Sequence, residues 1–286
     1  MSRAFVMTVD VEDWFTSSVD LFSEAAATGQ HDRPPDASVL PNTLRCLELF
    51  ARNNSKATFF ILTPVAAAYP DLIREMERQG HEVGIHAYRH RLVYQLTPAE
   101  FEEDLLRSLD ILRGIGIERI WGYRAPYWSI TRKSLWALDI LQKHGLRYDA
   151  SIFPIRRGLY GIPDAPTFPH EIRPGFWEFP PATLRCAGIN LPIAGGGYLR
   201  MLPFALLKKF ITRAQRQGPL IFYLHPYELD PADAGLPTRI NRLRSRLYYW
   251  QQMVGRRGNP IKIEKLLQLA RFNSIAGTFT QELGLT

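Results

Sequence analysis

The acidic residues near the start of the chain and the histidines near residue 90 could together bind a metal ion. The segment TVDVEDWF contains three carboxylates, Asp10, Glu12 and Asp13, within four residues. Carboxylates this close repel one another unless a cation or a basic side chain lies among them. The segment GIHAYRH contains His86 and His90, whose spacing lets two side chains on one helical turn share an ion. The alternative interpretation is a solvated acidic turn and a histidine-rich loop.

Other chemically active side chains also follow apolar runs. Arg124 lies in GYRAPYWS, Asp149 in YDASIFP and His225 in LHPYELD. In parallel barrels the carboxyl ends of the strands meet at one face, where active sites are built. Two histidines and one carboxylate suffice to hold a catalytic Zn²⁺ that keeps a position open for water. A remaining carboxylate and histidine could then act as base and acid. Taken singly, Arg124 could instead be a surface ion-pair partner, and His225 a core histidine.

Apolar, β-branched runs alternate with amphipathic stretches along most of the chain. The predicted strands cover residues 4–9, 57–62, 82–85, 119–122, 146–149 and 219–224. The predicted helices cover 42–53 and 71–79, a segment opened by a capping box at Thr97–Glu100, a segment from Thr131 to near Gly145, and a segment from Pro203 to near Gly218. Strands that alternate with helices favour a parallel sheet, here an α/β fold with a closed or partly closed barrel.

The region around 150–200 breaks this alternation. It is rich in proline and glycine, and we expect long loops or short strands there. The region is too apolar to be a linker, so we predict one domain over residues 1–286, with a distinct C-terminal part from about residue 230.

Composition excludes some classes of protein and leaves others open. The formal net charge is +7, and much of the surplus lies in the basic, aromatic segment 238–250. Such a segment could contact nucleic acid, an anionic glycan or a membrane surface, or form a subunit contact in a homo-oligomer. No nucleic-acid motif accompanies it, and we expect a solvated helix face and no nucleic-acid partner. No transmembrane segment or signal peptide is recognisable, and two cysteines fit a reducing compartment, so we expect a cytoplasmic protein.

The ordered motifs resemble those of the polysaccharide deacetylases with a NodB homology domain, carbohydrate esterase family 4. TVDVED resembles the first motif, HAYRH the H-x-x-x-H metal motif, RAPYW the third, YDASIFP the fourth and LHP the fifth. The variant first motif, the segment GGGYLRMLP and the tail after HPYELDP resemble a subgroup found with bacterial exopolysaccharide and O-antigen loci, related to the allantoinase-like and peptidoglycan deacetylase branch. The resemblance implies a distorted (β/α) barrel and removal of an N-acetyl group from an N-acetylated saccharide.

The resemblance also implies a ligand set. Asp10 aligns with the family's base, and His86 and His90 align with two of its metal ligands. The family's first motif has adjacent aspartates, whereas here the carboxylates fall at 10, 12 and 13. We expect Asp13 to be the third ligand because aspartate is the family's usual type, with Glu12 as the alternative. The expected ion is Zn²⁺, although such sites accept other divalent ions.

The remaining motif residues are expected to act on the substrate. Arg124 would orient Asp10, and the backbone N–H of Tyr127 would contact the oxyanion. His225 would protonate the leaving amine, with Asp149 favouring its imidazolium form. Pro126 and Trp128 would contact the sugar.

Three other functions remain open from the sequence. They are a metal-free, allantoinase-like amidohydrolase, an O-acetyl esterase and a catalytically silent glycan-binding module. The first would be expected to lack the ligand set, and the last would be expected to lack Asp10 or His225. All of these residues are present.

Overall fold

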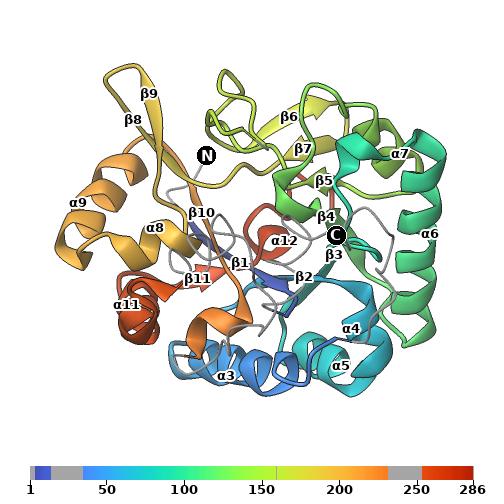
Figure 1. Cartoon of the computed structure of the whole chain (residues 1–286), viewed down its shortest axis with the longest axis horizontal. Helices are drawn as coiled ribbons and strands as arrows, with labels where there is room; N and C mark the ends of the chain where they lie inside the picture. Colours follow the sequence, from blue (N-terminus) through green and yellow to red (C-terminus); the bar gives the residue numbers. More distant parts are fainter. Residues whose placement is uncertain (1–3, 14–34, 159, 231–252, 286) are drawn as a thin grey trace, which may run out of the picture.

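The computed structural model describes residues 4–13, 35–158, 160–230 and 253–285. Most of its strands form one curled sheet, with helices packed around the outside (Figure 1). The strands of this sheet are β1 (Phe5–Val11), β2 (Thr58–Ile61), β3 (Glu82–Ile85), β4 (Ile120–Tyr123), β5 (Tyr148–Asp149), β6 (His170–Arg173), β7 (Phe176–Glu178), β10 (Leu220–Leu224) and β11 (Phe272–Asn273). A separate hairpin joins β8 (Thr183–Cys186) to β9 (Ile189–Pro192).

Hydrogen bonding orders the sheet as β10-β1-β2-β3-β4-β5-β7-β6, and β11 also pairs with β1. All neighbours are parallel except β6 and β7, which are antiparallel. The sheet curls as a half-barrel, so the predicted α/β class and distorted (β/α) barrel are confirmed (Figure 1).

The α-helices connect successive strands and cover the sheet. They are α3 (Val39–Arg52), α4 (Thr63–Ala68), α5 (Pro70–Arg78), α6 (Pro98–Gly114), α7 (Ala137–Lys143), α8 (Gly196–Met201), α9 (Phe204–Gln215), α11 (Asn259–Leu267) and α12 (Ile275–Thr278). Short 3-10 helices are η1 (Val93–Gln95), η2 (Pro126–Trp128), η3 (Pro226–Leu229) and η4 (Arg256–Gly258). Of these α-helices, α12 lies inside the curl of the sheet (Figure 1).

Both faces of β1 are buried, and the two faces differ in chemistry. The odd-numbered residues of β1, from Phe5 to Val11, join the apolar cluster between the sheet and the outer helices. Val6 belongs instead to the inner cluster, which includes Phe60 and Ile275 of α12. Because side chains alternate along a strand, the inner face continues through Thr8 and Asp10 toward the carboxyl end. The interior therefore changes from apolar to polar along the strand.

The predicted helices are confirmed, with one shift in a boundary. Thr97 and Glu100 form the expected capping box at the start of α6. The helix expected from Thr131 begins only at Ala137, because Ser134 accepts the amide of Thr131 and holds a turn there. In the region 150–200 short strands and loops are present, as expected.

Three further expectations bear on partners. Among the described residues no helix is long and apolar enough to cross a membrane. Cys46 is buried and Cys186 is exposed, and neither forms a disulfide. The basic segment 238–250 lies outside the described residues.

Candidate metal and acid–base site

Six side chains predicted from sequence to do chemistry gather at the carboxyl end of the sheet. They are Asp10 and Glu12 at the end of β1, His86 and His90 after β3, Arg124 after β4, and His225 after β10. The first five are almost completely buried, whereas the side chain of His225 keeps 18% of its surface exposed. The parallel strands thus bring together groups separated by more than 200 positions in the sequence.

Glu12, His86 and His90 form a cluster that could hold a metal ion. One ligand atom from each residue lies within 4.8 Å of the others. Glu12 Oε2 is 2.5 Å from His90 Nε2 and 3.6 Å from His86 Nε2. Two imidazole nitrogens and one carboxylate oxygen make up a donor set typical of a catalytic divalent cation.

The tautomer of His86 supports this interpretation. Its Nδ1 lies 2.8 Å from the carbonyl oxygen of Arg124. Because a carbonyl can only accept, Nδ1 carries a proton, and Nε2, which faces the cluster, is the nitrogen able to bind a cation. Burial alone would raise the pKa of Glu12, but His90 and His86 outweigh burial and hold that pKa well below its usual range. The carboxylate is therefore ionised, as a metal ligand must be.

The carboxylate in this cluster is that of Glu12 and not of the expected Asp13. Asp13 Oδ2 accepts the backbone N–H of Asp36 at 3.0 Å, and Asp13 does not join the metal-ligand cluster. The physical reason is the alternation of side chains along β1. Glu12 has the same parity as Asp10 and continues the inner face, whereas Asp13 has the opposite parity. The described cluster therefore favours Glu12, the alternative, over Asp13 as the third ligand.

Asp10 and Arg124 form a buried ion pair beside this cluster. Arg124 Nη1 donates to Asp10 Oδ1 at 2.8 Å and lies 2.7 Å from Thr8 Oγ1. The guanidinium also contacts the rings of Phe60 and Trp128, at 4.4 and 4.5 Å from their centroids. A buried, planar guanidinium in contact with two aromatic rings has little freedom to turn, so it fixes the position of the Asp10 carboxylate.

His225 faces both carboxylates of β1. Its Nε2 is 3.4 Å from Glu12 Oε1 and 3.9 Å from Asp10 Oδ2. On its other side, Nδ1 is 3.6 Å from Glu228 Oε1. Burial would lower the pKa of His225, but Glu228, Glu12 and Asp10 together raise that pKa above its ordinary value.

Asp149 lies elsewhere, contrary to the expectation that it would pair with His225. Its carboxylate accepts hydrogen bonds from the Ser151 hydroxyl at 2.6 Å and the Ser151 amide at 3.1 Å, and it neighbours Glu178 across the β5–β7 pair. Within the described part of the chain no ion pair joins Asp149 to His225. Four strands separate β5 from β10 in the sheet, so the two side chains approach the site from different sides.

The turn η2 carries the expected substrate-contacting residues. Tyr127 and Trp128 both adopt positive φ, 53° and 55°, which a bulky side chain rarely does. The ring of Tyr127 packs against that of His90 at 4.8 Å, which places this turn beside the metal-ligand cluster. Trp128 is buried against Tyr223 at 4.9 Å. The roles of Tyr127, Trp128 and Pro126 toward a substrate stay predictions.

Sequence analysis did not single out Glu228, although a signal for it exists. Glu228 follows His225 by three residues, and Pro226 begins a 3-10 turn between them. Residues three apart lie on the same side of such a turn. The spacing H-P-Y-E could therefore have identified a carboxylate beside the histidine.

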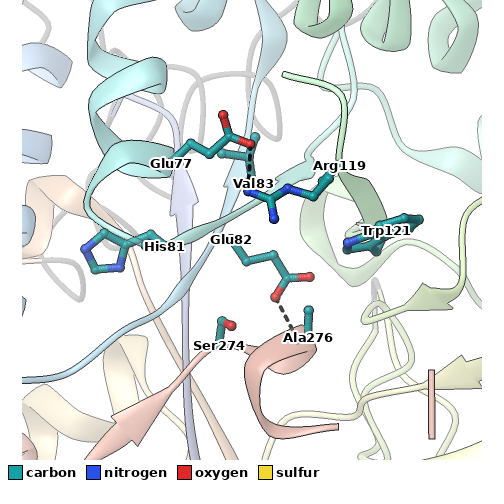
Figure 2. Close-up of a pocket in the computed structure, with 9 residues that line it drawn as sticks. Glu77, His81, Glu82, Val83, Arg119, Trp121, Ser274 and Ala276 are labelled. Carbon is teal, nitrogen blue, oxygen red and sulfur yellow. Dashed lines mark hydrogen bonds and ion pairs between the residues drawn. The ribbon is translucent and has the colours of Figure 1, made fainter. Parts of the chain in front are cut away.

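A pocket of about 220 Å³ lies at the opposite end of the sheet, where β3 and β4 begin. Figure 2 shows Glu82 at its centre, with Glu77 and Arg119 forming an ion pair at 3.6 Å near Trp121. Glu82 accepts the backbone N–H of Ala276 at 2.9 Å, which ties α12 to this end of the sheet (Figure 2). Its carboxylate is already fully used by the fold.

Comparison with known proteins supports a relationship suggested by these motifs. Residues 32–148 match the model of the polysaccharide deacetylase family, and residues 150–280 match a domain of unknown function (DUF3473). The two matches meet at β5.

Two similar proteins are named as deacetylases of peptidoglycan. A peptidoglycan deacetylase of Helicobacter pylori is 30% identical over 38% of this chain and 36% of its own length. A peptidoglycan-N-acetylglucosamine deacetylase of Bacillus cereus is 27% identical over 41% of this chain and 42% of its own length. The chain thus spans less than half the length of these relatives. Over these shared lengths the chain is similar to the two deacetylases.

The fold is shared more widely than the sequence. A crystal structure of a Mycobacterium smegmatis protein assigned as a polysaccharide deacetylase superposes with a TM-score of 0.61, over 98% of this chain and 90% of that one. The identity is 18%, so this likeness concerns the fold alone.

Proposed function

We propose that the protein is a metal-dependent hydrolase that removes the N-acetyl group from an N-acetylated saccharide. The observation that carries this proposal is the convergence of Glu12, His86 and His90 beside the Asp10–Arg124 pair and His225. Hydrolysis of an amide needs a base for water, a charge stabiliser and an acid for the leaving amine. Each of these requirements has a candidate group within this one site.

Glu12, His86 and His90 would hold the ion, which we propose to be Zn²⁺ or another divalent cation. The donor set and the nitrogen that His86 turns toward the cluster fit such an ion. When bound, the cation would supply Lewis acidity that makes water a stronger nucleophile and polarises the acetyl carbonyl.

Asp10 would take the proton of the attacking water, and Arg124 would keep the carboxylate oriented. His225 would deliver a proton from Nε2 to the leaving nitrogen as the C–N bond breaks. The backbone N–H of Tyr127 would contact the developing oxyanion. The balanced reaction consumes one water and yields acetate and an amino sugar.

The substrate class is inferred from the resemblance. GGGYLRMLP resembles a subgroup found with exopolysaccharide and O-antigen loci, and its first glycines contact Tyr223. A Cβ on Gly195 would lie 1.8 Å from the Tyr223 carbonyl, so only glycine fits so close to β10. We propose a bacterial surface-polysaccharide precursor as substrate, modified in the cytoplasm by a single domain that includes residues 150–200 and the part after 230.

The test separates this function from its rivals. Protein purified without added metal is assayed for bound ions, then for acetate release from N-acetyl sugars, sugar nucleotides and O-acetylated sugars, before and after chelation. We expect one divalent ion per chain and chelator-sensitive release from N-acetyl substrates. Metal-free activity would favour the amidohydrolase, release from O-acetyl sugars alone the esterase, and binding without release the silent module.

A further inference from the structure

Glu228 is a buried carboxylate for which the mechanism above has no role. It lies in η3, three residues after His225, and only 2% of its surface is exposed. Its Oε1 is 3.6 Å from His225 Nδ1 and 3.5 Å from Nη1 of Arg200, which is also buried. Burying a carboxylate costs free energy unless the charge is paired or hydrogen-bonded by its neighbours. One of those partners is the proposed acid.

The fold holds this carboxylate in place by its backbone. The Glu228 amide donates to the His225 carbonyl at 3.0 Å, which closes the turn. Arg256, which is buried, donates to the Tyr227 carbonyl at 2.7 Å, and Asn259 Nδ2 donates to the Glu228 carbonyl at 3.3 Å. The C-terminal segment thus fixes the turn that carries both His225 and Glu228.

The His225 ring is fixed on a second side. It stacks on Tyr227 with centroids 4.9 Å apart and planes 13° apart. With the ring plane set, its two nitrogens face different partners. Nε2 faces Asp10 and Glu12, and Nδ1 faces Glu228. A carboxylate only accepts hydrogen bonds, so Glu228 favours a proton on Nδ1, while Asp10 and Glu12 favour one on Nε2 of the protonated ring. Once Nε2 has given up its proton, Glu228 favours the neutral ring with its proton on Nδ1.

We propose that Glu228 is a positioning residue that sets the orientation and the Nδ1–H tautomer of His225, in the place expected for Asp149. The inference rests on the proposed function, because it gives His225 the role of acid. Contacts of this kind are commonly longer before substrate binds, which fits the 3.6 Å separation. Arg200 in turn keeps Glu228 from turning away from the histidine.

The test compares an amide with an ester whose leaving group needs no proton. In Glu228→Gln, kcat for an N-acetyl sugar should fall about 10- to 100-fold, in the range seen for residues that orient a site histidine. The kcat for 4-nitrophenyl acetate should change less than about threefold, since a phenolate leaves without an acid. Metal content should equal that of the wild type. The matched control is Asp230→Asn, two residues away, whose carboxylate pairs with Arg45 on the surface.

Two further variants separate positioning from a merely structural role. Glu228→Asp keeps the negative charge that faces Arg200 but shortens the side chain that reaches His225. Its stability should therefore be close to that of the wild type, while kcat for the amide stays low. This variant decides the matter if Glu228→Gln does not fold. In His225→Ala, adding Glu228→Gln should cost little more, because two residues that act as one unit are not additive. Equal losses on amide and ester, or full rescue by Glu228→Asp, would overturn the inference.

A spectroscopic readout keeps this inference distinct from the proposed function. In ¹⁵N-labelled wild type, the neutral His225 ring should carry its proton on Nδ1. An Nε2–H tautomer overturns the role of Glu228 whatever the activity. Conversely, wild type that releases no acetate from any N-acetyl sugar refutes the proposed function, and the tautomer still reports on Glu228.

Discussion

The two ends of the curled sheet each bury a glutamate near a histidine, yet the two glutamates have opposite surroundings. At the carboxyl end, Glu12 faces the nitrogens of His86 and His90. At the amino end, Glu82 accepts hydrogen bonds from the Thr58 hydroxyl at 2.6 Å, the Tyr148 hydroxyl at 2.8 Å and a backbone amide. Burial of a carboxylate therefore does not distinguish a functional site from a structural one. The chemistry of its partners does.

The pKa directions express the same difference. Burial would raise the pKa of Glu12, but the histidines lower it below its usual range. The pKa of Glu82 is raised, because burial outweighs the hydrogen bonds from Thr58, Ala276 and Tyr148. One end thus holds an anion ready for a cation, and at the other end hydrogen bonds from the fold's own groups occupy the buried carboxyl.

The largest expected effect comes from Glu12→Gln. A carboxamide is a poor ligand for a divalent cation, so the bound ion and nearly all acetate release should be lost. Metal analysis after dialysis and the acetate assay check this outcome. The control is Asp13→Asn, which should keep both, because Asp13 lies outside the metal-ligand cluster. Loss of metal from Asp13→Asn with retention in Glu12→Gln would reverse the assignment.

Asp10→Asn should separate the base from the ion. We expect metal content near that of wild type and kcat lower by about 10²- to 10⁴-fold, the usual cost of removing a positioned base. Thermal stability should also fall, because Arg124 stays buried without its carboxylate. Metal analysis, steady-state kinetics and calorimetry on the same preparation measure the three quantities. Wild-type kcat in this variant would remove Asp10 from the chemistry.

Some site residues are indicated by a pattern in the sequence, and others are not. The βα rhythm predicts the barrel, and motif order predicts that the strand ends converge. The period of two along β1 could also have predicted Glu12, because Glu12 shares the parity of Asp10. The resemblance to the family, whose usual ligand is aspartate, favours Asp13 instead.

Asp149 and Glu228 show what the linear pattern does not contain. Which carboxylate meets His225 depends on the order of strands around the sheet, and β5 and β10 are neighbours neither in sequence nor in that order. Glu228 reaches the histidine through a local turn that is itself held by Arg256, a contact across 29 positions of sequence. Tertiary contacts of this kind leave little trace in composition or periodicity.

Glu82→Gln tests the opposite end and should affect only stability. The amide loses the second acceptor oxygen of a buried carboxyl that serves Thr58, Tyr148 and Ala276. We expect the unfolding free energy to fall by about 1–3 kcal/mol, the cost of leaving buried polar groups unsatisfied. Denaturant unfolding measures this change. Metal content and kcat should match wild type, and a loss of either at unchanged stability would break the contrast between the two ends.

The last effect is seen only as a dependence on pH, and it concerns Glu178 and Asp149, buried side by side at the carboxyl end. Burial raises the pKa of Asp149 to about 6, and burial together with Asp149 raises the pKa of Glu178 well above its ordinary value. Both folded-state pKa values exceed the unfolded ones. The stability that the pair contributes is therefore complete below about pH 4 and is lost as pH rises through the folded-state pKa values.

Glu178→Gln should reduce this dependence, because an amide cannot ionise and can still accept the Ile152 N–H that Glu178 Oε1 accepts at 2.9 Å. Above about pH 5 the unfolding free energy of wild type should fall relative to the variant by up to about 1.4 kcal/mol per pH unit, the value for one proton. Urea unfolding of both proteins at pH 5, 6, 7 and 8 measures the difference. Parallel curves would mean that Glu178 ionises freely in the fold. A divergence would show that the carboxyl end also contains a protonated structural pair, so that partner chemistry, and not position in the sheet, separates the two kinds of buried acid.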